Sequence, residues 1–296
     1  MDKFPSRAKS SAATLDLRVS AIVVAHNIRA DASGRAPLDL CLRSALAEEW
    51  IDELVIVDHD NPEAVSSALR AFEADRRDVT VVKTEPDLSF AAAANAGVEH
   101  ARGRWLLFLE ADVVLQRGAV ARMAAAGGGA RRPWIVGGQL LDLEGRARKA
   151  ARAGALSTFS AIAVAVDWPP RAVRRTQKDV AAKVGAVSGA FMLIPRKDFD
   201  ELSGFDAKFD TDYADLDLCH RAAAAGGSVL FQPEAAGVQF EYARQRKRKQ
   251  AQGLTLFAMK SAKTPMEKAF AAVAGPALSV LLTLKDLVAG RPPARR

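Results

Sequence analysis

The chain has 296 residues, enough for one large domain or for one domain with an appended tail. Its hydrophobic fraction of 49% and charged fraction of 26% are close to globular averages, which excludes a disordered or collagen-like protein. Two cysteines cannot form a disulfide framework, and no Cys and His residues have zinc-ligand spacing. The N-terminus lacks the apolar stretch of a signal peptide, so we expect a cytoplasmic protein.

The net charge of +7 is unevenly distributed along the chain. Residues 244–296 contain twelve lysines and arginines but only two acids, whereas residues 1–243 contain 30 basic and 33 acidic residues. A nucleic-acid-binding domain more often spreads its basic surface through the fold, so we expect no nucleic-acid partner. An anionic membrane surface, contacted through residues 244–290, is one candidate partner of the basic tail.

Apolar runs and helical spacings alternate through the first half of the chain. Uniformly apolar segments predict buried strands, and residues with helical spacing separate them. The predicted strands are Val19–Ala25, Leu54–Val57, Val79–Lys83 and Trp105–Leu109, and the predicted helices are Leu38–Glu48, Ala64–Ala74 and Ala91–Ala101. This alternation predicts an α/β fold in which helices cover both faces of a mostly parallel sheet.

The second half is regular only beyond residue 183. The pattern there predicts a strand at Ala186–Ile194, helices at Lys197–Leu202 and Asp215–Ala225, and a strand at Val229–Phe231. Near the C-terminus, 16 uncharged residues at Ala269–Leu284 are fewer than the roughly 20 that span a bilayer, and Pro276 interrupts them. Contact with a membrane surface, packing on the protein's own body and binding to a partner chain all remain open for this segment.

Polar residues directly follow three of the predicted strands. Asn27, Asp58 and the triplet Glu110-Ala111-Asp112 hold these positions. Ligands of parallel α/β sheets bind beyond the carboxyl ends of the strands, so we expect the three groups to be neighbours in space. Two carboxylates in such a triplet can surround Mg²⁺ or Mn²⁺ together with phosphate oxygens, although a polar turn explains them equally well. Asp58 can accept a hydrogen bond from a base or a ribose, or it can cap a helix.

A third group of acids surrounds the predicted start of a helix. Asp210, Asp212, Asp215 and Asp217 lie within eight residues, and their mutual repulsion requires a cation or a positive helix end nearby. A carboxylate in this position can act as a general base towards an alcohol. Capping of the helix is the alternative interpretation.

Taken in order, these segments resemble the inverting glycosyltransferases of family 2, which have the GT-A fold. The matching text is VSAIVVAHN, ELVIVDHDN, SFAAAANAGVEHARGRWLLFLEADVVL and VSGAFMLIPRKDFDELSGFDAKFDTDYADLDLCHRAAAAGGSVLFQPEA. The most similar subgroup is the rhamnosyltransferase-like enzymes of bacterial surface-polysaccharide assembly. The resemblance implies a GT-A domain at residues 18–240, while composition predicts a flexible leader at 1–17 and a basic, partly amphipathic helical extension at 241–296.

The resemblance also implies roles for individual residues. Asp215 matches the catalytic base, and Gly189 matches the floor of the acceptor site. Asp217 and Trp168 are further candidates for acceptor contacts, the latter by stacking on a sugar or, alternatively, by simple loop packing. The implied contacts to the nucleotide sugar are Ala25, Asn27, Asp58, Asn95, Glu110, Ala111 and Asp112. Asp112 is also the implied ligand of Mn²⁺ or Mg²⁺, and Gln239 stands where many relatives have a histidine that can reach the metal.

The implied activity is inverting transfer of a hexosyl or deoxyhexosyl group from a nucleoside-diphosphate sugar to a glycan acceptor. A polyprenyl-pyrophosphate-linked acceptor of exopolysaccharide, capsule or lipopolysaccharide assembly would place the enzyme at the inner face of the cytoplasmic membrane. Ala214 replaces the glutamate that usually precedes the catalytic aspartate, and Gln239 is a weaker ligand than histidine. A catalytically impaired sugar-nucleotide-binding protein is therefore the main alternative, and a nucleic-acid-binding protein that uses the basic tail is less favoured.

Overall fold

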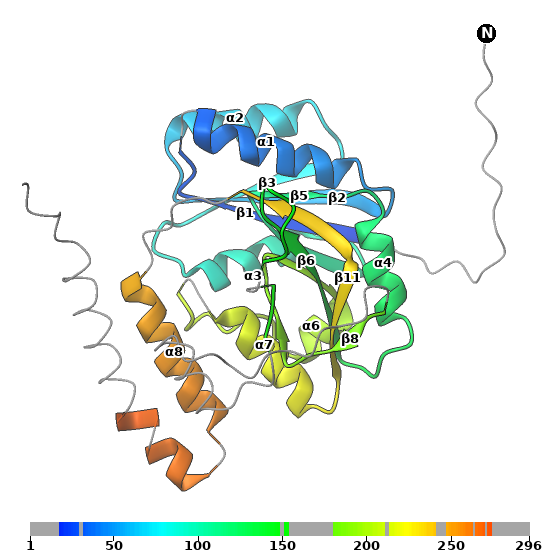
Figure 1. The fold of residues 1–296 in the computed structure, drawn as a ribbon. Coiled ribbons are helices and arrows are strands. Elements are labelled where there is room, and N and C mark those ends of the chain that lie inside the picture. Colours follow the sequence, from blue (N-terminus) through cyan, green and yellow to red (C-terminus); the bar gives the residue numbers. More distant parts are fainter. Residues whose placement is uncertain are drawn as a thin grey trace, which may run out of the picture.

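The structure is a computed structural model of the whole chain (Figure 1). The residues that it describes are 18–29, 32–148, 151–153, 180–210, 213–240, 247–262, 264–269 and 271–273. The predicted leader at 1–17, Trp168 and most of the uncharged run at 269–284 lie outside these residues.

A nine-stranded sheet forms the centre of the molecule. Its strands follow the order β3-β2-β1-β4-β10-β6-β11-β5, and β8 also pairs with β11. A separate two-stranded sheet pairs β7 with β9. The bounds are β1 Val19–His26, β2 Ile51–His59, β3 Val79–Thr84, β4 Trp105–Glu110, β5 Val113–Leu115, β6 Trp134–Leu141, β7 Arg152–Ala153, β8 Ala182–Lys183, β9 Ala186–Val187, β10 Phe191–Pro195 and β11 Ser228–Gln239.

The sheet is parallel in its first half and mixed in its second. Strands β3, β2, β1 and β4 run parallel, as the alternating pattern predicts. Strand β10 runs antiparallel to both β4 and β6, while β11 is parallel to β6 and antiparallel to β5 and β8. The prediction of a mostly parallel sheet is therefore wrong for this half, because an apolar strand buried in the centre of a sheet looks the same in either direction.

The predicted strand at Ala186–Ile194 is in fact two strands. Strand β9 ends at Val187 and β10 begins at Phe191, so Ser188, Gly189 and Ala190 form a connection between them. The Phe191 N–H donates to the Ser188 carbonyl, which closes this connection into a turn. The break matters because the turn enters the cavity described below.

Helices cover both faces of the parallel half. In Figure 1, α1 and α2 lie above β1, β2 and β3, and α3 lies below them. Helix α3 packs closely on the sheet because Gly97 has no side chain. A Cβ atom at this position would lie only 2.6 Å from Cγ2 of Val57. The helices are α1 Ala32–Leu46, α2 Glu63–Ala74, α3 Phe90–His100, α4 Ala119–Gly127, α6 Arg196–Glu201, α7 Ala214–Ala224 and α8 Lys247–Ser261.

Helix α8, within the predicted C-terminal extension, packs against the body of the molecule. Leu254 and Phe257 of α8 are 1% exposed and form a small apolar cluster with the fully buried Phe209, which precedes α7. The helix lies beside α7 (Figure 1). Among the described residues, no helix is both long enough and apolar enough to span a bilayer.

Candidate active site

The carboxyl ends of β1, β2 and β4 bring together residues from three separate stretches of sequence. Ala25 pairs in register with Asp58, and Val24 pairs with Glu110. Just past the end of β1, the N–H of Asn27 donates to the carbonyl of His59 at 3.4 Å. The structure thus confirms that the strand-end residues are neighbours at one edge of the sheet.

Asn61 links the ends of β1 and β2 through side-chain hydrogen bonds. Its Nδ2 donates to the carbonyl of Ala25 at 2.6 Å and to Oδ1 of Asp58 at 2.8 Å. Its Oδ1 accepts the N–H of Ile28 at 2.8 Å. Asp58 is 2% exposed, so Asn61 fixes the direction of a nearly buried carboxylate. Asn61 was not among the predicted site residues; the Asp-x-x-Asn spacing after a buried strand is the signal that could have revealed its role.

Two histidines stack beside Asp58. The rings of His26 and His59 lie 4.8 Å apart at 27°, and Nδ1 of His59 is 3.0 Å from Oγ1 of Thr84. Burial lowers the pKa of His59 below its ordinary value of 6.5, and this outweighs the opposite effect of Asp60. His59 is therefore predominantly neutral at physiological pH.

The acidic triplet after β4 meets Gln239 at the end of β11. Nε2 of Gln239 donates to Oε2 of Glu110 at 2.6 Å and lies 3.4 Å from Oδ1 of Asp112. The pairing of Val113 with Gln239 between β5 and β11 produces this approach, and the Phe240 N–H also donates to the Asp112 carbonyl. Asp112 is 2% exposed and Ala111 is 8% exposed. Two carboxylates therefore converge on a single amide group.

This convergence fits a hard divalent cation. The described residues contain no group of three or more His, Cys, Asp or Glu side chains that could hold a metal by themselves. Mg²⁺ and similar cations, however, are commonly held by one or two carboxylates, with substrate phosphates and water completing the coordination. The oxygens of Glu110 and Asp112, which lie within 3.4 Å of the same amide nitrogen, provide such a partial set.

Asp215 lies in the first turn of α7 and touches the turn between β9 and β10. Its Oδ2 accepts the N–H of Gly189 at 2.7 Å, and its Oδ1 accepts the N–H of Leu216 at 2.8 Å. A Cβ atom at Gly189 would lie 3.2 Å from Cβ of Asp215, so only glycine allows this approach without displacement. Tyr213, just before the helix, has a φ of 74°, a strained conformation for a residue with a bulky side chain.

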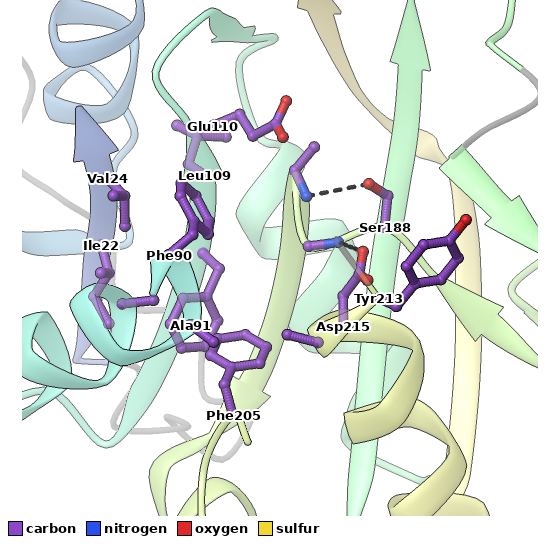
Figure 2. Close-up of a pocket in the computed structure, with 15 residues that line it drawn as sticks. Ile22, Val24, Phe90, Ala91, Leu109, Glu110, Ser188, Phe205, Tyr213 and Asp215 are labelled. Atoms are coloured by element: carbon purple, nitrogen blue, oxygen red, sulfur yellow. Dashed lines mark hydrogen bonds between the residues drawn. The ribbon is translucent and has the colours of Figure 1, made fainter. Parts of the chain in front are cut away.

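A cavity that opens to solvent lies between Glu110 and Asp215. Figure 2 shows Asp215, Ser188 and Tyr213 on one side, Ile22, Val24 and Leu109 on the other, and Glu110 at one end. Its lining residues are Ile22, Val24, Phe90, Ala91, Ala94, Phe108, Leu109, Glu110, Ser188, Gly189, Ala190, Phe205, Tyr213, Ala214 and Asp215. Its mainly apolar walls thus carry a carboxylate from β4 and a second carboxylate from α7.

Among the predicted site residues that the structure describes, Glu110, Gly189 and Asp215 line this cavity, whereas the others lie outside its lining: Ala25, Asn27, Asp58, Asn95, Ala111, Asp112, Asp217 and Gln239. Asn95 pairs with the backbone of Phe205, donating to its carbonyl at 2.8 Å and accepting its N–H at 3.0 Å. The carboxylate of Asp217, 2% exposed, pairs with Nε of Arg221 and with Nζ of Lys260, each at 2.7 Å. Asn95 and Asp217 thus hold neighbouring segments in place, while Trp168 lies outside the described residues.

Comparison with known families assigns the chain to a class. The sequence model described as Glycosyl transferase family 2 matches residues 20–202, which is more than half of the chain. The chain therefore belongs to glycosyl transferase family 2. No curated protein matches the chain as a whole.

Solved glycosyltransferases share the fold. GalNAc-T7, solved with UDP, GalNAc and Mn²⁺, has a TM-score of 0.63 and 16% identity over 94% of this chain, which spans 59% of the GalNAc-T7 chain. The mannosyltransferase PcManGT from Pyrobaculum calidifontis, in complex with GDP-Man and Mn²⁺, has a TM-score of 0.56 and 18% identity over 94% of this chain and 77% of its own. TarS 1–349 from S. aureus has a TM-score of 0.54 and 12% identity, and the match covers 90% of this chain and 72% of the TarS chain. At these identities the likeness establishes the fold, and it confirms the predicted GT-A architecture.

Proposed function

We propose that the chain transfers a hexosyl or deoxyhexosyl group from a nucleoside-diphosphate sugar to a glycan hydroxyl with inversion at the anomeric carbon. The observation that carries this proposal is the placement of Asp215 in the same cavity as Glu110. One carboxylate lies where a diphosphate and cation would bind, and the other lies where an acceptor would enter. Family membership supports sugar transfer in general, and the two neighbours solved with nucleotides and Mn²⁺ support the kind of donor.

The donor is proposed to bind along the strand ends. Asp58, oriented by Asn61, accepts a hydrogen bond from the base or the ribose, and the backbone at Ala25 and Asn27 lies beside it. Glu110, Asp112 and Gln239 are the residues that would hold Mn²⁺ or Mg²⁺. When bound, the cation neutralises the charge that develops on the departing diphosphate.

Asp215 is proposed to be the general base. The N–H groups of Gly189 and Leu216 each donate to one carboxylate oxygen and so fix the direction of the carboxylate. As the acceptor oxygen bonds to the anomeric carbon, its proton passes to Asp215 and the bond from that carbon to the diphosphate breaks. One displacement of this kind inverts the configuration.

The acceptor is proposed to be a lipid-linked glycan of bacterial surface-polysaccharide assembly, reached at the inner face of the membrane. The five basic residues within 244–249 support this proposal through their attraction to anionic lipid headgroups. Their side chains lie outside the described residues.

Transfer kinetics test the proposed reaction. Purified protein is supplied with a panel of UDP-, GDP- and dTDP-sugars, glycan acceptors and Mn²⁺, and the anomeric configuration of the product is read by NMR. We expect Asp215→Asn to lower kcat by about 10²–10⁴-fold with little change in the KM for the donor. Asp52→Asn, an exposed change on β2, is the matched control and should behave like the wild type.

Two results would contradict the proposal. An Asp215→Asn variant that keeps near-native kcat would remove Asp215 as the base. A wild-type protein that binds a nucleotide sugar but transfers nothing to any acceptor would instead favour the sugar-nucleotide-binding alternative, which the replacement of glutamate by Ala214 motivates.

A further inference from the structure

Lys260, near the end of α8, joins two acidic side chains of the body. Its Nζ lies 2.6 Å from Oδ2 of Asp206 and 2.7 Å from Oδ1 of Asp217. The Lys260 side chain is 31% exposed, whereas that of Asp217 is only 2% exposed. The partners come from three separate places: α8, the loop after α6, and α7.

The buried carboxylate of Asp217 makes this arrangement more than a surface ion pair. Exposed ion pairs contribute little, but a buried carboxylate that loses one of its cations is left partly uncompensated. Arg221 is its second cation, and Arg221 also donates to the carbonyls of Leu202 and Gly204. Although burial favours the neutral acid, the Lys260 ammonium and the Lys208 N–H lower the pKa of Asp206 below its ordinary value. These groups form one charged network.

The network connects directly to the cavity. Asp217 lies two residues beyond Asp215 in the first turn of α7, so the direction of that turn sets the direction of both side chains. Asp206 follows Phe205, which lines the cavity and whose backbone is held by Asn95. A shift of Lys260 would therefore act on both segments that border the proposed acceptor side.

Apolar packing around Lys260 supports the same segment. Its Nζ lies 5.2 Å from the centre of the Phe209 ring, and Phe209 packs against Leu254 and Phe257 of α8. Tyr213, with its positive φ, packs against the same cluster. A strained residue of this kind keeps its conformation only when its surroundings hold it. Helix α8 supplies part of those surroundings immediately before Asp215.

We propose that Lys260 is a positioning residue that holds Asp215 in the orientation needed for proton transfer. The proposal rests on the function proposed above, with Asp215 as general base. Lys260 does not line the cavity and touches no reacting group; it acts through Asp217 and Asp206. Helix α8 then contributes to catalysis, in addition to any contact that the basic tail makes with a partner.

Replacement of Lys260 by methionine tests the proposal, since it removes the ammonium and keeps most of the alkyl chain over Phe209. We expect kcat of Lys260→Met to fall roughly 10- to 100-fold, as for a misplaced catalytic group, while the donor KM stays within about twofold. Thermal unfolding is measured in parallel, and kcat is expressed per folded molecule. A purely structural role would lower the folded fraction without lowering this corrected kcat.

Two further variants make the result decisive. Lys260→Arg keeps a cation that can pair with both carboxylates and should restore kcat to within about threefold of the wild type. Lys197→Met removes a lysine that pairs with Glu201 on α6, away from the cavity, and should leave both kinetic constants unchanged.

The possible outcomes separate this inference from the proposed function. A wild-type enzyme that transfers sugar, together with a Lys260→Met variant of native corrected kcat, would overturn the positioning role and leave the function intact. A fall in kcat that Lys260→Arg does not restore would also overturn it, because the charge would then not be the cause. Absence of transfer by the wild type would instead count against the proposed function itself.

Discussion

Gly189 has little room for a side chain beside the proposed base. A Cβ atom there would lie 3.2 Å from Cβ of Asp215, closer than most real contacts of this kind. We therefore expect Gly189→Ala to displace the proposed base by a few tenths of an ångström and to lower kcat by about tenfold, at a cost of about 1 kcal/mol in the free energy of unfolding.

Steady-state kinetics and urea unfolding check this expectation. Gly128→Ala, whose added methyl group would meet only ordinary contacts, is the control. If Gly189→Ala kept wild-type kcat, close contact with Asp215 would not matter for the reaction.

A second prediction for a single residue concerns Asn61. Replacement by alanine removes three hydrogen bonds, to Ala25, Ile28 and Asp58. We expect Asn61→Ala to lose about 1–3 kcal/mol of stability and to raise the donor KM, because Asp58 is no longer oriented. Urea unfolding and donor titration measure the two effects, with the exposed Ser67→Ala as control. An unchanged KM would argue against a donor contact by Asp58.

Sequence could predict the site in part. Asn27, Asp58 and Glu110 each follow a buried strand, and the rule for strand ends was enough to place them together. The contacts of Gln239 and Lys260 could not be predicted from the residues alone. Gln239 meets Glu110 across 129 residues and Lys260 meets Asp206 across 54, and such pairings depend on how the chain packs.

At the scale of the element, α3 packs closely on the sheet near the site. A Cβ atom at Gly97 would lie 2.6 Å from Val57 and 3.1 Å from Ile22. Alanine favours the helix over glycine by about 1 kcal/mol, but overpacking costs about 1–3 kcal/mol. We expect Gly97→Ala to be destabilising overall by about 1–2 kcal/mol.

Chemical denaturation of a matched pair measures this effect. Gly129→Ala, where an added Cβ meets no atom within 4 Å, should change stability by less than about 0.5 kcal/mol. Equal stability of the two variants would mean that α3 can move away from β1 and β2.

The elements also show why only part of the fold could be predicted. The first four strands alternate with helices, and this alternation requires parallel neighbours. After β6 this alternation is lost: Ser188–Ala190 joins β9 of the small sheet directly to β10 of the large sheet, and such short strands give no periodic signal of their direction. Strand direction in that half is decided by tertiary packing.

At the scale of the whole molecule, stability should depend on pH through His59. Its folded pKa lies below 6.5 because the ring is buried, so the unfolded chain binds a proton at a higher pH than the native protein does. The free energy of unfolding should therefore fall as pH drops below about 6.5 and level off once the native histidine is also protonated.

Urea unfolding from pH 7.5 to 5 tests this dependence. The free energy of unfolding of a His59→Asn variant should depend less on pH across this range than that of the wild type, even if the variant is less stable at pH 7.5. Parallel curves for the two proteins would show that another group causes the acid sensitivity.

In the proposed enzyme, the donor binds at the carboxyl ends of β1, β2 and β4, and Asp215 lies on the opposite side of the cavity. A crystal structure with a nucleoside diphosphate and Mn²⁺ tests it most directly. We predict the base or ribose against Asp58, the diphosphate and metal beside Glu110 and Asp112, and the terminal phosphate facing the cavity that Asp215 lines. Nucleotide bound at another face, with these three carboxylates untouched, would contradict the account.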